Sequence, residues 1–161
     1  MMTSARALQV RTPRLAERDA IVATITSDAT FKASEVAVAV ELIDAALAGS
    51  VDYLLLVALR DEEIVGYICF GPTPMTDATW DLYWVVVGAA HRGLGAARTL
   101  VAGMEAEIKT RGGRHVRVET SETEGYGAAR ALYARLSYPE ASVLPDFYSG
   151  GDALITYYKR L

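Results

Sequence analysis

The chain has 161 residues, of which 52% are hydrophobic and 22% are charged, and its formal net charge is −4. This balance excludes a disordered chain, and the acidic excess argues against a nucleic-acid-binding protein, which normally carries a basic surface. The length suits one domain with a substantial buried core, so we expect a single domain over residues 1–161.

Cysteine and histidine usage restricts the setting and the chemistry. Cys69 is the only cysteine, so no internal disulfide can form, and a reducing, cytoplasmic compartment is expected. Two histidines without clustered cysteines predict no metal site. Residues 1–7 lack the apolar core of a signal peptide and are expected to form a flexible tail. No apolar run approaches about 20 residues, so we expect no membrane segment.

The first half of the chain predicts a short strand, two helices and a hairpin. The second helix is expected to be capped at Ser34 and Glu35 and to end at Gly49. Two apolar runs flank the charged residues 60–63, which is typical of an antiparallel hairpin. The expected bounds are Leu8–Arg11 for the first strand, Glu17–Thr26 for the first helix, and Tyr53–Leu59 and Ile64–Phe70 for the hairpin strands.

The second half is organised around the stretch from Trp80 to Arg111. An apolar, β-branched run at residues 82–87 predicts a buried central strand, and residues 71–74 before it predict a surface loop. A helix should follow, with a stripe at Leu94, Ala97, Leu100, Val101, Met104 and Ile108. The later elements are a strand at His115–Thr120 parallel to the central strand, a helix at Tyr126–Leu136 ended by Pro139, strand-like pieces at Ala141–Leu144 and Ala153–Tyr158, and a turn-rich segment at Asp146–Asp152.

A glycine-bearing turn joins the central strand to its helix. Gly93 and Gly95 follow Arg92 there, and glycines at a helix start let backbone N–H groups surround an anion such as a phosphate. A nucleotide P-loop would need a lysine after its last glycine, whereas Ala96 and Ala97 follow here. A dinucleotide fingerprint would need a third glycine. The spacing Arg92-x-x-Gly95-x-Ala97 instead resembles the acyl-CoA pyrophosphate loop of the GNAT acetyltransferases.

Further motifs extend the resemblance to almost the whole chain. The predicted order β-α-α-β-β-β-α-β-α-β-β is similar to that of the GNAT family, and residues 62–67 resemble its hairpin. Residues 129–138 resemble its fourth-helix pattern, Ala-x-x-Leu-Tyr-x-x-x-Gly-Phe, with Ser137-Tyr138 in place of the last pair. The resemblance implies an α/β (α+β) fold, in which helices cover both faces of a mixed, mostly antiparallel central sheet. The segment at residues 146–152 resembles a tail in one subgroup of bacterial members.

The resemblance also implies acetyl-CoA as co-substrate. The N–H groups of residues 92–97 would take its pyrophosphate, with charge from Arg92 and Arg98, and residues 85–87 would pair with its pantetheine arm. Tyr126 stands where the family often has an asparagine that contacts this arm. The expected cofactor-binding residues are Val85, Val86, Val87, Arg92, Gly93, Leu94, Gly95, Ala96, Ala97, Arg98 and Tyr126.

Amine acetylation needs a general acid for the leaving thiolate and a base for the ammonium. Tyr133 occupies the family's usual acid position, although a tyrosine packed in the core would be found at the same place. Candidates for the base are Asp81, Tyr83 and Glu119. Asp81 could equally be a solvated aspartate at the strand start. Glu119 lies mid-strand, where burial would need a partner such as Arg117 or Arg92.

These observations favour an N-acetyltransferase that acts on a primary amine of a small metabolite or of a protein or peptide. The alternative is a non-catalytic acyl-CoA-binding or regulatory module, in which the phosphate-binding turn remains without the chemistry. The expected partners are acetyl-CoA and an amine acceptor, without nucleic acid or membrane. Whether the chain forms a homodimer is left open by the sequence.

Overall fold

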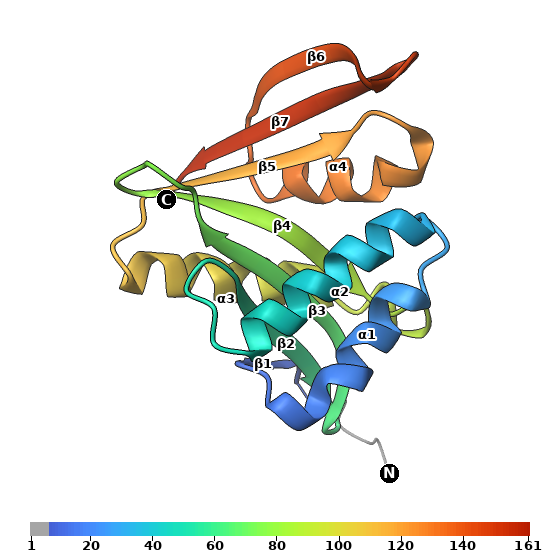
Figure 1. The fold of residues 1–161 in the computed structure, drawn as a ribbon, viewed down its shortest axis with the longest axis vertical. Coiled ribbons are helices and arrows are strands. Elements are labelled where there is room, and N and C mark those ends of the chain that lie inside the picture. Colours follow the sequence, from blue (N-terminus) through green and yellow to red (C-terminus); the bar gives the residue numbers. More distant parts are fainter. Residues whose placement is uncertain (1–6) are drawn as a thin grey trace. The chain divides into compact units, whose positions relative to one another are not determined.

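The computed structural model describes residues 7–161, and Figure 1 shows its elements. They follow the predicted order of strands and helices. In chain order they are β1 (Gln9–Arg11), η1 (Leu15–Glu17), α1 (Arg18–Thr26), α2 (Ala33–Leu47), β2 (Leu54–Arg60), β3 (Glu63–Pro72), β4 (Thr79–Val87), η2 (Ala89–His91), α3 (Ala96–Thr110), β5 (His115–Ser121), η3 (Glu124–Tyr126), α4 (Gly127–Arg135), β6 (Glu140–Ser149) and β7 (Asp152–Arg160). Most of the predicted tail, residues 1–6, lies outside the described residues.

The strands form a sheet in the order β1-β2-β3-β4-β5-β7-β6, which confirms the mixed α/β class. The pairs β1/β2, β5/β7 and β6/β7 are antiparallel, and β4/β5 is parallel as predicted. The chain divides into two compact units, unit 1 with Met1–Cys69 and Trp84–Met104, and unit 2 with Phe70–Tyr83 and Glu105–Leu161. The single domain over residues 1–161 stays a prediction. Among residues 7–161, no helix combines the length and apolarity that crossing a bilayer requires.

Unit 1 buries the apolar faces of α1 and α2. Ile21 and Ile25 of α1 and Ile43 of α2 are fully buried. The two helices contact each other, and α2 also contacts β2. Predicting the cap of α2 at Ser34 was wrong, because the helix begins at Ala33. The Lys32 N–H donates to the Glu35 carboxylate at 2.7 Å, so Glu35 caps the helix from inside its first turn.

The predicted hairpin of unit 1 is confirmed and has a tight turn. β2 and β3 are hydrogen-bonded neighbours, and the residues between them are Asp61 (φ 50°) and Glu62 (φ 68°). Positive φ at both positions is what a two-residue hairpin turn with native twist requires. The prediction that residues 71–74 leave the sheet was partly wrong, because β3 continues to Pro72 and the loop begins at Thr73.

Unit 2 consists of the start of β4 with β5, β7 and β6, which lie side by side in Figure 1, together with α4 and the end of α3. Strand alternation gives this part of the sheet an apolar face and a polar face. Trp80, Val116 and Val118 on the apolar face are buried. A Cβ on Gly113 would lie 2.3 Å from Ile108 and 2.5 Å from Trp80, so α3 packs closely on this face.

The last strands of unit 2 are longer than predicted. β6 covers residues 140–149, so much of the segment expected to be a turn is strand, and all of β6 is exposed at the sheet edge. An edge position tolerates Pro145, which has no N–H to donate. The helix α4 ends at Arg135 with Leu136 as its C-cap, within one residue of the predicted end at Leu136, and a turn closes it before Pro139. Ser137 adopts φ 62°, and the Tyr138 N–H donates to the Tyr133 carbonyl at 2.9 Å, which closes the helix end.

Candidate active site

The turn between β4 and α3 places two glycines directly before the helix. Gly93 (φ 78°) and Gly95 (φ 79°) have left-handed backbones, and a Cβ on either would meet nothing within 4 Å. The Thr99 N–H donates to the Gly95 carbonyl at 3.1 Å, so the N–H groups of residues 96–98 precede the helical ladder. These N–H groups and the helix dipole favour an anion at this end of α3.

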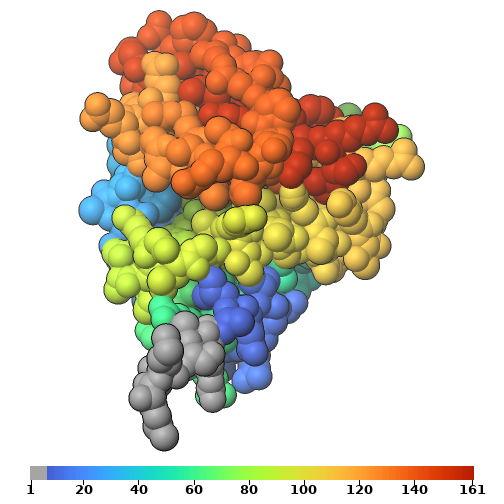
Figure 2. Space-filling model, turned by 180° about the vertical axis from the view of Figure 1, so that it is seen from behind, coloured from blue at the N-terminus to red at the C-terminus, as the bar shows by residue number. Residues whose placement is uncertain are grey.

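This turn lies at the molecular surface, where the residues that follow β4 appear yellow-green in Figure 2. The Arg92 side chain is 53% exposed. The prediction that Leu94 belongs to the helical stripe was wrong, because α3 begins only at Ala96 and Leu94 is exposed. The left-handed glycines on both sides of Leu94 interrupt the helical path.

The loop after α1 is tied to the turn by two polar contacts within unit 1. The Asp28 carboxylate forms an ion pair with Arg92 at 2.8 Å, and the Ser27 hydroxyl accepts from the Ala89 N–H at 3.2 Å. Asp28 also accepts from the Thr30 N–H at 2.9 Å, which holds its carboxylate in place. The expected phosphate ligand Arg92 therefore already has an acidic partner, which the sequence did not indicate.

Residues 85–87, which were expected to meet the pantetheine arm, form the end of β4. On one side they adjoin β3 closely, since a Cβ on Gly66 would lie 2.6 Å from the Val86 carbonyl oxygen. The Gly88 N–H donates to the Val65 carbonyl at 2.8 Å and continues this contact. Glycine at position 66 is thus required for the approach of the two strands. The pairing of residues 85–87 with a ligand stays a prediction.

Two tyrosines of interest lie around α4 in unit 2. Tyr126 ends η3 just before the helix and is half-buried. Tyr133 is 4% exposed, and its ring lies 5.4 Å from that of Tyr157 and 6.0 Å from that of Tyr138. Burial raises the pKa of the Tyr133 phenol above its ordinary value. The phenol therefore stays protonated at neutral pH and could donate a proton.

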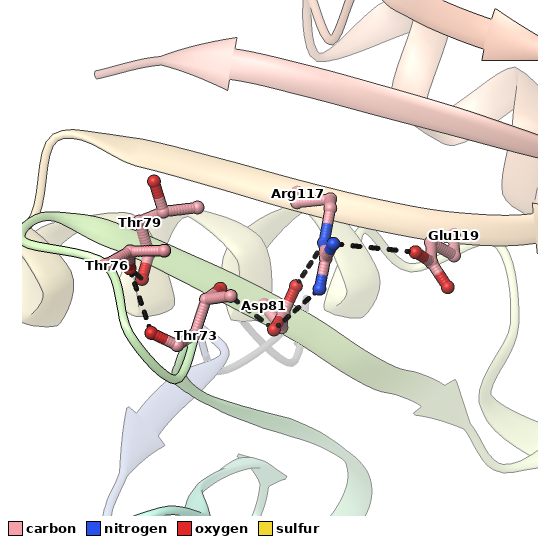
Figure 3. A network of polar contacts seen from close by, with 6 residues as sticks. All are labelled: Thr73, Thr76, Thr79, Asp81, Arg117 and Glu119. Atoms are coloured by element: carbon pink, nitrogen blue, oxygen red, sulfur yellow. Dashed lines mark hydrogen bonds and ion pairs between the residues drawn. The ribbon is translucent and has the colours of Figure 1, made fainter.

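The carboxylate of Asp81 lies at the centre of a polar network, which Figure 3 shows. Its Oδ1 accepts from Arg117 Nε at 2.7 Å, and its Oδ2 accepts from Arg117 Nη2 at 3.2 Å and from the Thr73 hydroxyl at 2.8 Å. The Asp81 residue is buried, with 7% exposed. Bonding to this carboxylate raises the pKa of Arg117. The alternative of a solvated aspartate at the strand start does not describe Asp81.

Glu119 differs from Asp81 in its exposure. Its side chain is 46% exposed. Glu119 is therefore not buried, and it does not need the partner that burial would have required. Arg117 is nevertheless near, with Nη1 3.8 Å from the Glu119 carboxylate, which is an ion pair beyond hydrogen-bond distance. Arg117 thus joins two of the three proposed base candidates. The third, Tyr83, is two residues beyond Asp81 on the same strand face, half-buried, and contributes to the electrostatics of Arg117.

Within unit 2, this network and Tyr133 belong to opposite faces of the sheet. The Tyr133 ring contacts Tyr157 of β7, whereas the neighbouring Thr156 is paired with Glu119 of β5. Paired residues share a face, and successive residues of a strand alternate between faces. The acid candidate and the carboxylates therefore lie on opposite faces of this part of the sheet.

Sequence reasoning missed Ser27, Asp28 and Thr73, and named Arg117 only as a partner that would explain Glu119. Each has a polar side chain in a loop or on a strand face. The contact partners of Ser27 and Arg117 are distant in sequence, 62 residues for Ser27 with Ala89 and 36 for Arg117 with Asp81, whereas Thr73 bonds to Asp81 across a loop of the same hairpin region, eight residues away. The period-two alternation at residues 115–120 did place Arg117 and Glu119 on one face. That alternation was the available signal for their proximity.

Among the described residues, the single cysteine is buried and no cluster of metal-ligating side chains is present. Cys69 is fully buried, and burial raises the pKa of its thiol to about 12, so it carries little of the reactive thiolate at neutral pH. Within residues 7–161, no group of three or more histidine, cysteine, aspartate or glutamate side chains could hold a metal ion. The polar chemistry near the sheet is that of carboxylates, an arginine and a tyrosine.

Comparison with known proteins gives a consistent family. The acetyltransferase (GNAT) family model matches residues 20–138. A solved GNAT-family protein from Desulfovibrio desulfuricans is 33% identical with a TM-score of 0.89, over 96% of this chain and 99% of that one. An aminoglycoside 6'-N-acetyltransferase complexed with coenzyme A is 18% identical (TM-score 0.75, covering 94% and 96%). The ribosomal-protein-S18-alanine N-acetyltransferase from Escherichia coli is 16% identical (TM-score 0.77, covering 96% and 94%). No curated protein matches the chain.

Proposed function

Since this chain belongs to the acetyltransferase (GNAT) family, we propose that it transfers an acetyl group from acetyl-CoA to a primary amine. The observation that carries this proposal is the open, glycine-bearing turn at the start of α3, where N–H groups precede the helical ladder. One similar structure holds coenzyme A. Two similar enzymes are named for a small-molecule and a ribosomal-protein acceptor, so the acceptor class stays open between these.

The residues present fit the pyrophosphate of acetyl-CoA. The space beside Gly93 and Gly95 is free of protein atoms within 4 Å of a notional Cβ. The N–H groups of residues 92–97 would hold the phosphates, and Arg92 and Arg98 would add positive charge. Arg92 would exchange Asp28 for a phosphate. Residues 85–87 and Tyr126 would contact the pantetheine arm in this proposal.

Tyr133 is the proposed general acid. When bound, acetyl-CoA supplies a thioester whose sulfur leaves as a thiolate. The Tyr133 phenol would donate its proton to that sulfur, and it is protonated at neutral pH because burial raises a pKa that ordinarily lies near 10. Tyr133 is held between two aromatic rings, which restricts its side chain for this task.

The acceptor must lose a proton before its nitrogen can attack, and the base candidates remain Asp81, Tyr83 and Glu119. In the described structure both oxygens of Asp81 already accept hydrogen bonds from Arg117 and Thr73. The Glu119 carboxylate is the more accessible one. Proton removal by Glu119, directly or through water, is the assignment that this exposure favours.

The proposal is tested by charge placement at the two ends of α3. Gly95→Glu puts a carboxylate where the pyrophosphate should bind, and we expect calorimetry to show loss of coenzyme A binding. Gly112→Glu is the matched control, because Gly112 also has a positive φ (82°) and nothing within 4 Å of a Cβ, but lies after the helix. Equal coenzyme A affinity in a folded Gly95→Glu protein contradicts the proposed site.

A second measurement addresses the reaction and its nucleotide-binding alternative. Coenzyme A should bind and ATP should not, because the turn lacks the lysine of a P-loop. Thiol release from acetyl-CoA should then depend on an added primary amine. Coenzyme A binding without release in any amine panel would favour the non-catalytic acyl-CoA-binding module instead.

A further inference from the structure

The Asp81 carboxylate and the Arg117 guanidinium form a closed unit on the polar face of unit 2. Arg117 uses Nε and Nη2 for the two oxygens of Asp81, and the Thr73 hydroxyl donates to the same carboxylate. Thr73 is itself fixed, because its N–H donates to the Thr79 carbonyl at 2.9 Å and its carbonyl accepts from the Thr76 hydroxyl at the same distance. Such a bidentate pair holds the guanidinium plane in one orientation.

The fixed orientation leaves one guanidinium nitrogen for Glu119. Arg117 Nη1 is 3.8 Å from the Glu119 carboxylate, close enough to attract it but too far for a hydrogen bond. Asp81 takes the direct contacts of Arg117, so the more distant Glu119 carboxylate is only weakly paired with the guanidinium. With its side chain 46% exposed, the Glu119 carboxylate can still accept hydrogen bonds from a ligand.

We propose that Glu119 recognises the ammonium group of a cationic acceptor and that Arg117, oriented by Asp81, is the positioning residue that holds Glu119 for this contact. This inference rests on the proposed acetyl transfer and specifies its acceptor as a protonated amine bound on the polar face of unit 2. Asp81 then acts through Arg117 rather than on the substrate.

The surroundings of Glu119 are mixed rather than purely acidic. Its paired residue on β7, Thr156, is neutral. The titratable side chains that share its face are Asp81 and Tyr83 on β4, His115 and Arg117 on β5, and Asp152, Tyr158 and Arg160 on β7, where Asp152 accepts a hydrogen bond from Ser121. The aromatic ring of Tyr158 stacks on His115 at 5.3 Å, which leaves an exposed ring beside Arg117. Glu119 therefore lies on a face that carries carboxylates, arginines and an exposed aromatic ring, and its partly exposed carboxylate can accept hydrogen bonds from an ammonium group.

The test uses four primary-amine probes, which are spermidine, tobramycin, a lysine peptide with a blocked N-terminus, and a peptide with a free N-terminal alanine. For the probe with the highest kcat/KM, we expect Glu119→Gln to raise KM about 10- to 100-fold, as expected for the loss of a charge-assisted hydrogen bond. Because Glu119 is also the proposed base, kcat should fall as well, so binding is read from KM and from the dissociation constant. The dissociation constant of that probe, measured by calorimetry without acetyl-CoA, should rise equally. Affinity for coenzyme A should not change.

Glu107→Gln is the matched control. Glu107 is likewise a partly exposed carboxylate paired with an arginine, Arg111 at 2.8 Å, but it lies on α3, which packs against the opposite face of the sheet. It should leave probe affinity unchanged. Equal losses in both variants would mean a general effect of charge and would overturn the inference, as would an unchanged KM and dissociation constant in a folded Glu119→Gln protein.

Arg117→Lys tests the positioning role, because lysine keeps the positive charge beside Asp81 but cannot make the two-point contact of the guanidinium with the carboxylate. We expect probe affinity to fall about 3- to 10-fold in the wild-type background and not at all in the Glu119→Gln background. A merely structural role would lower affinity in both. If Arg117→Lys does not fold, Glu119→Gln with its control still decides. If Glu119→Gln acetylates the probe with an unchanged KM, only this inference is refuted. If the wild-type protein acetylates none of the four probes, the proposed function is refuted as well.

Discussion

Replacing Tyr133 by phenylalanine separates a catalytic hydroxyl from a packed ring. The ring contacts with Tyr138 and Tyr157 would be kept, so we expect stability to change by no more than about 1 kcal/mol. A general acid contributes about 10²- to 10⁴-fold, which corresponds to about 2.7–5.5 kcal/mol of transition-state stabilisation. The single-turnover rate should fall by that factor while coenzyme A affinity is retained. Single-turnover rates are the appropriate assay, because product release can limit kcat.

The control for this experiment is Tyr138→Phe in the same aromatic cluster. The Tyr138 hydroxyl is buried and has no hydrogen-bond partner, so its removal should leave the chemical step intact and raise stability by about 1 kcal/mol in urea denaturation. The two substitutions are chemically identical and their rings lie 6.0 Å apart. Unchanged single-turnover chemistry in Tyr133→Phe, or equal slowing in both variants, would refute the reasoning that makes Tyr133 the acid.

Two further predictions concern unit 1. The Arg92 side chain is 53% exposed, so its ion pair with Asp28 is worth about 0.2–1 kcal/mol. Because Arg92 would have to leave Asp28 to bind a phosphate, Asp28→Asn should tighten coenzyme A binding about 1.4- to 5-fold in calorimetry. Weaker binding by Asp28→Asn would contradict this exchange of partners. The hydrogen bonds from Arg11 and from the Arg14 N–H lower the pKa of Glu17 from 4.5 to about 2, so the stability it adds is complete above pH 4.5 and is lost between pH 4.5 and 2. Urea denaturation should show a loss of about 1 kcal/mol across this window that is absent in Glu17→Gln.

Features encoded within a few consecutive residues could be predicted from the sequence. The β-branched run of β4, the glycines before α3 and the helical spacing of Leu100, Met104 and Ile108 depend on local backbone preference and on burial of one face. For the same reason the element order and the parallel pairing of β4 with β5 followed from the sequence. Errors occurred at element ends, such as Leu94 before α3, where the left-handed glycine backbone overrides helical spacing.

The partners of the charged residues were decided by the tertiary structure alone. Asp81 and Arg117 lie 36 residues apart and meet only because β4 and β5 pair in the register that places them opposite each other. Glu119 lies on the same face of β5 as Arg117 but is 46% exposed, and the loop after α1 brings Asp28 to Arg92. Sequence spacing shows that a carboxylate is present, but the register of two strands decides whether it is buried and bonded or open to a ligand.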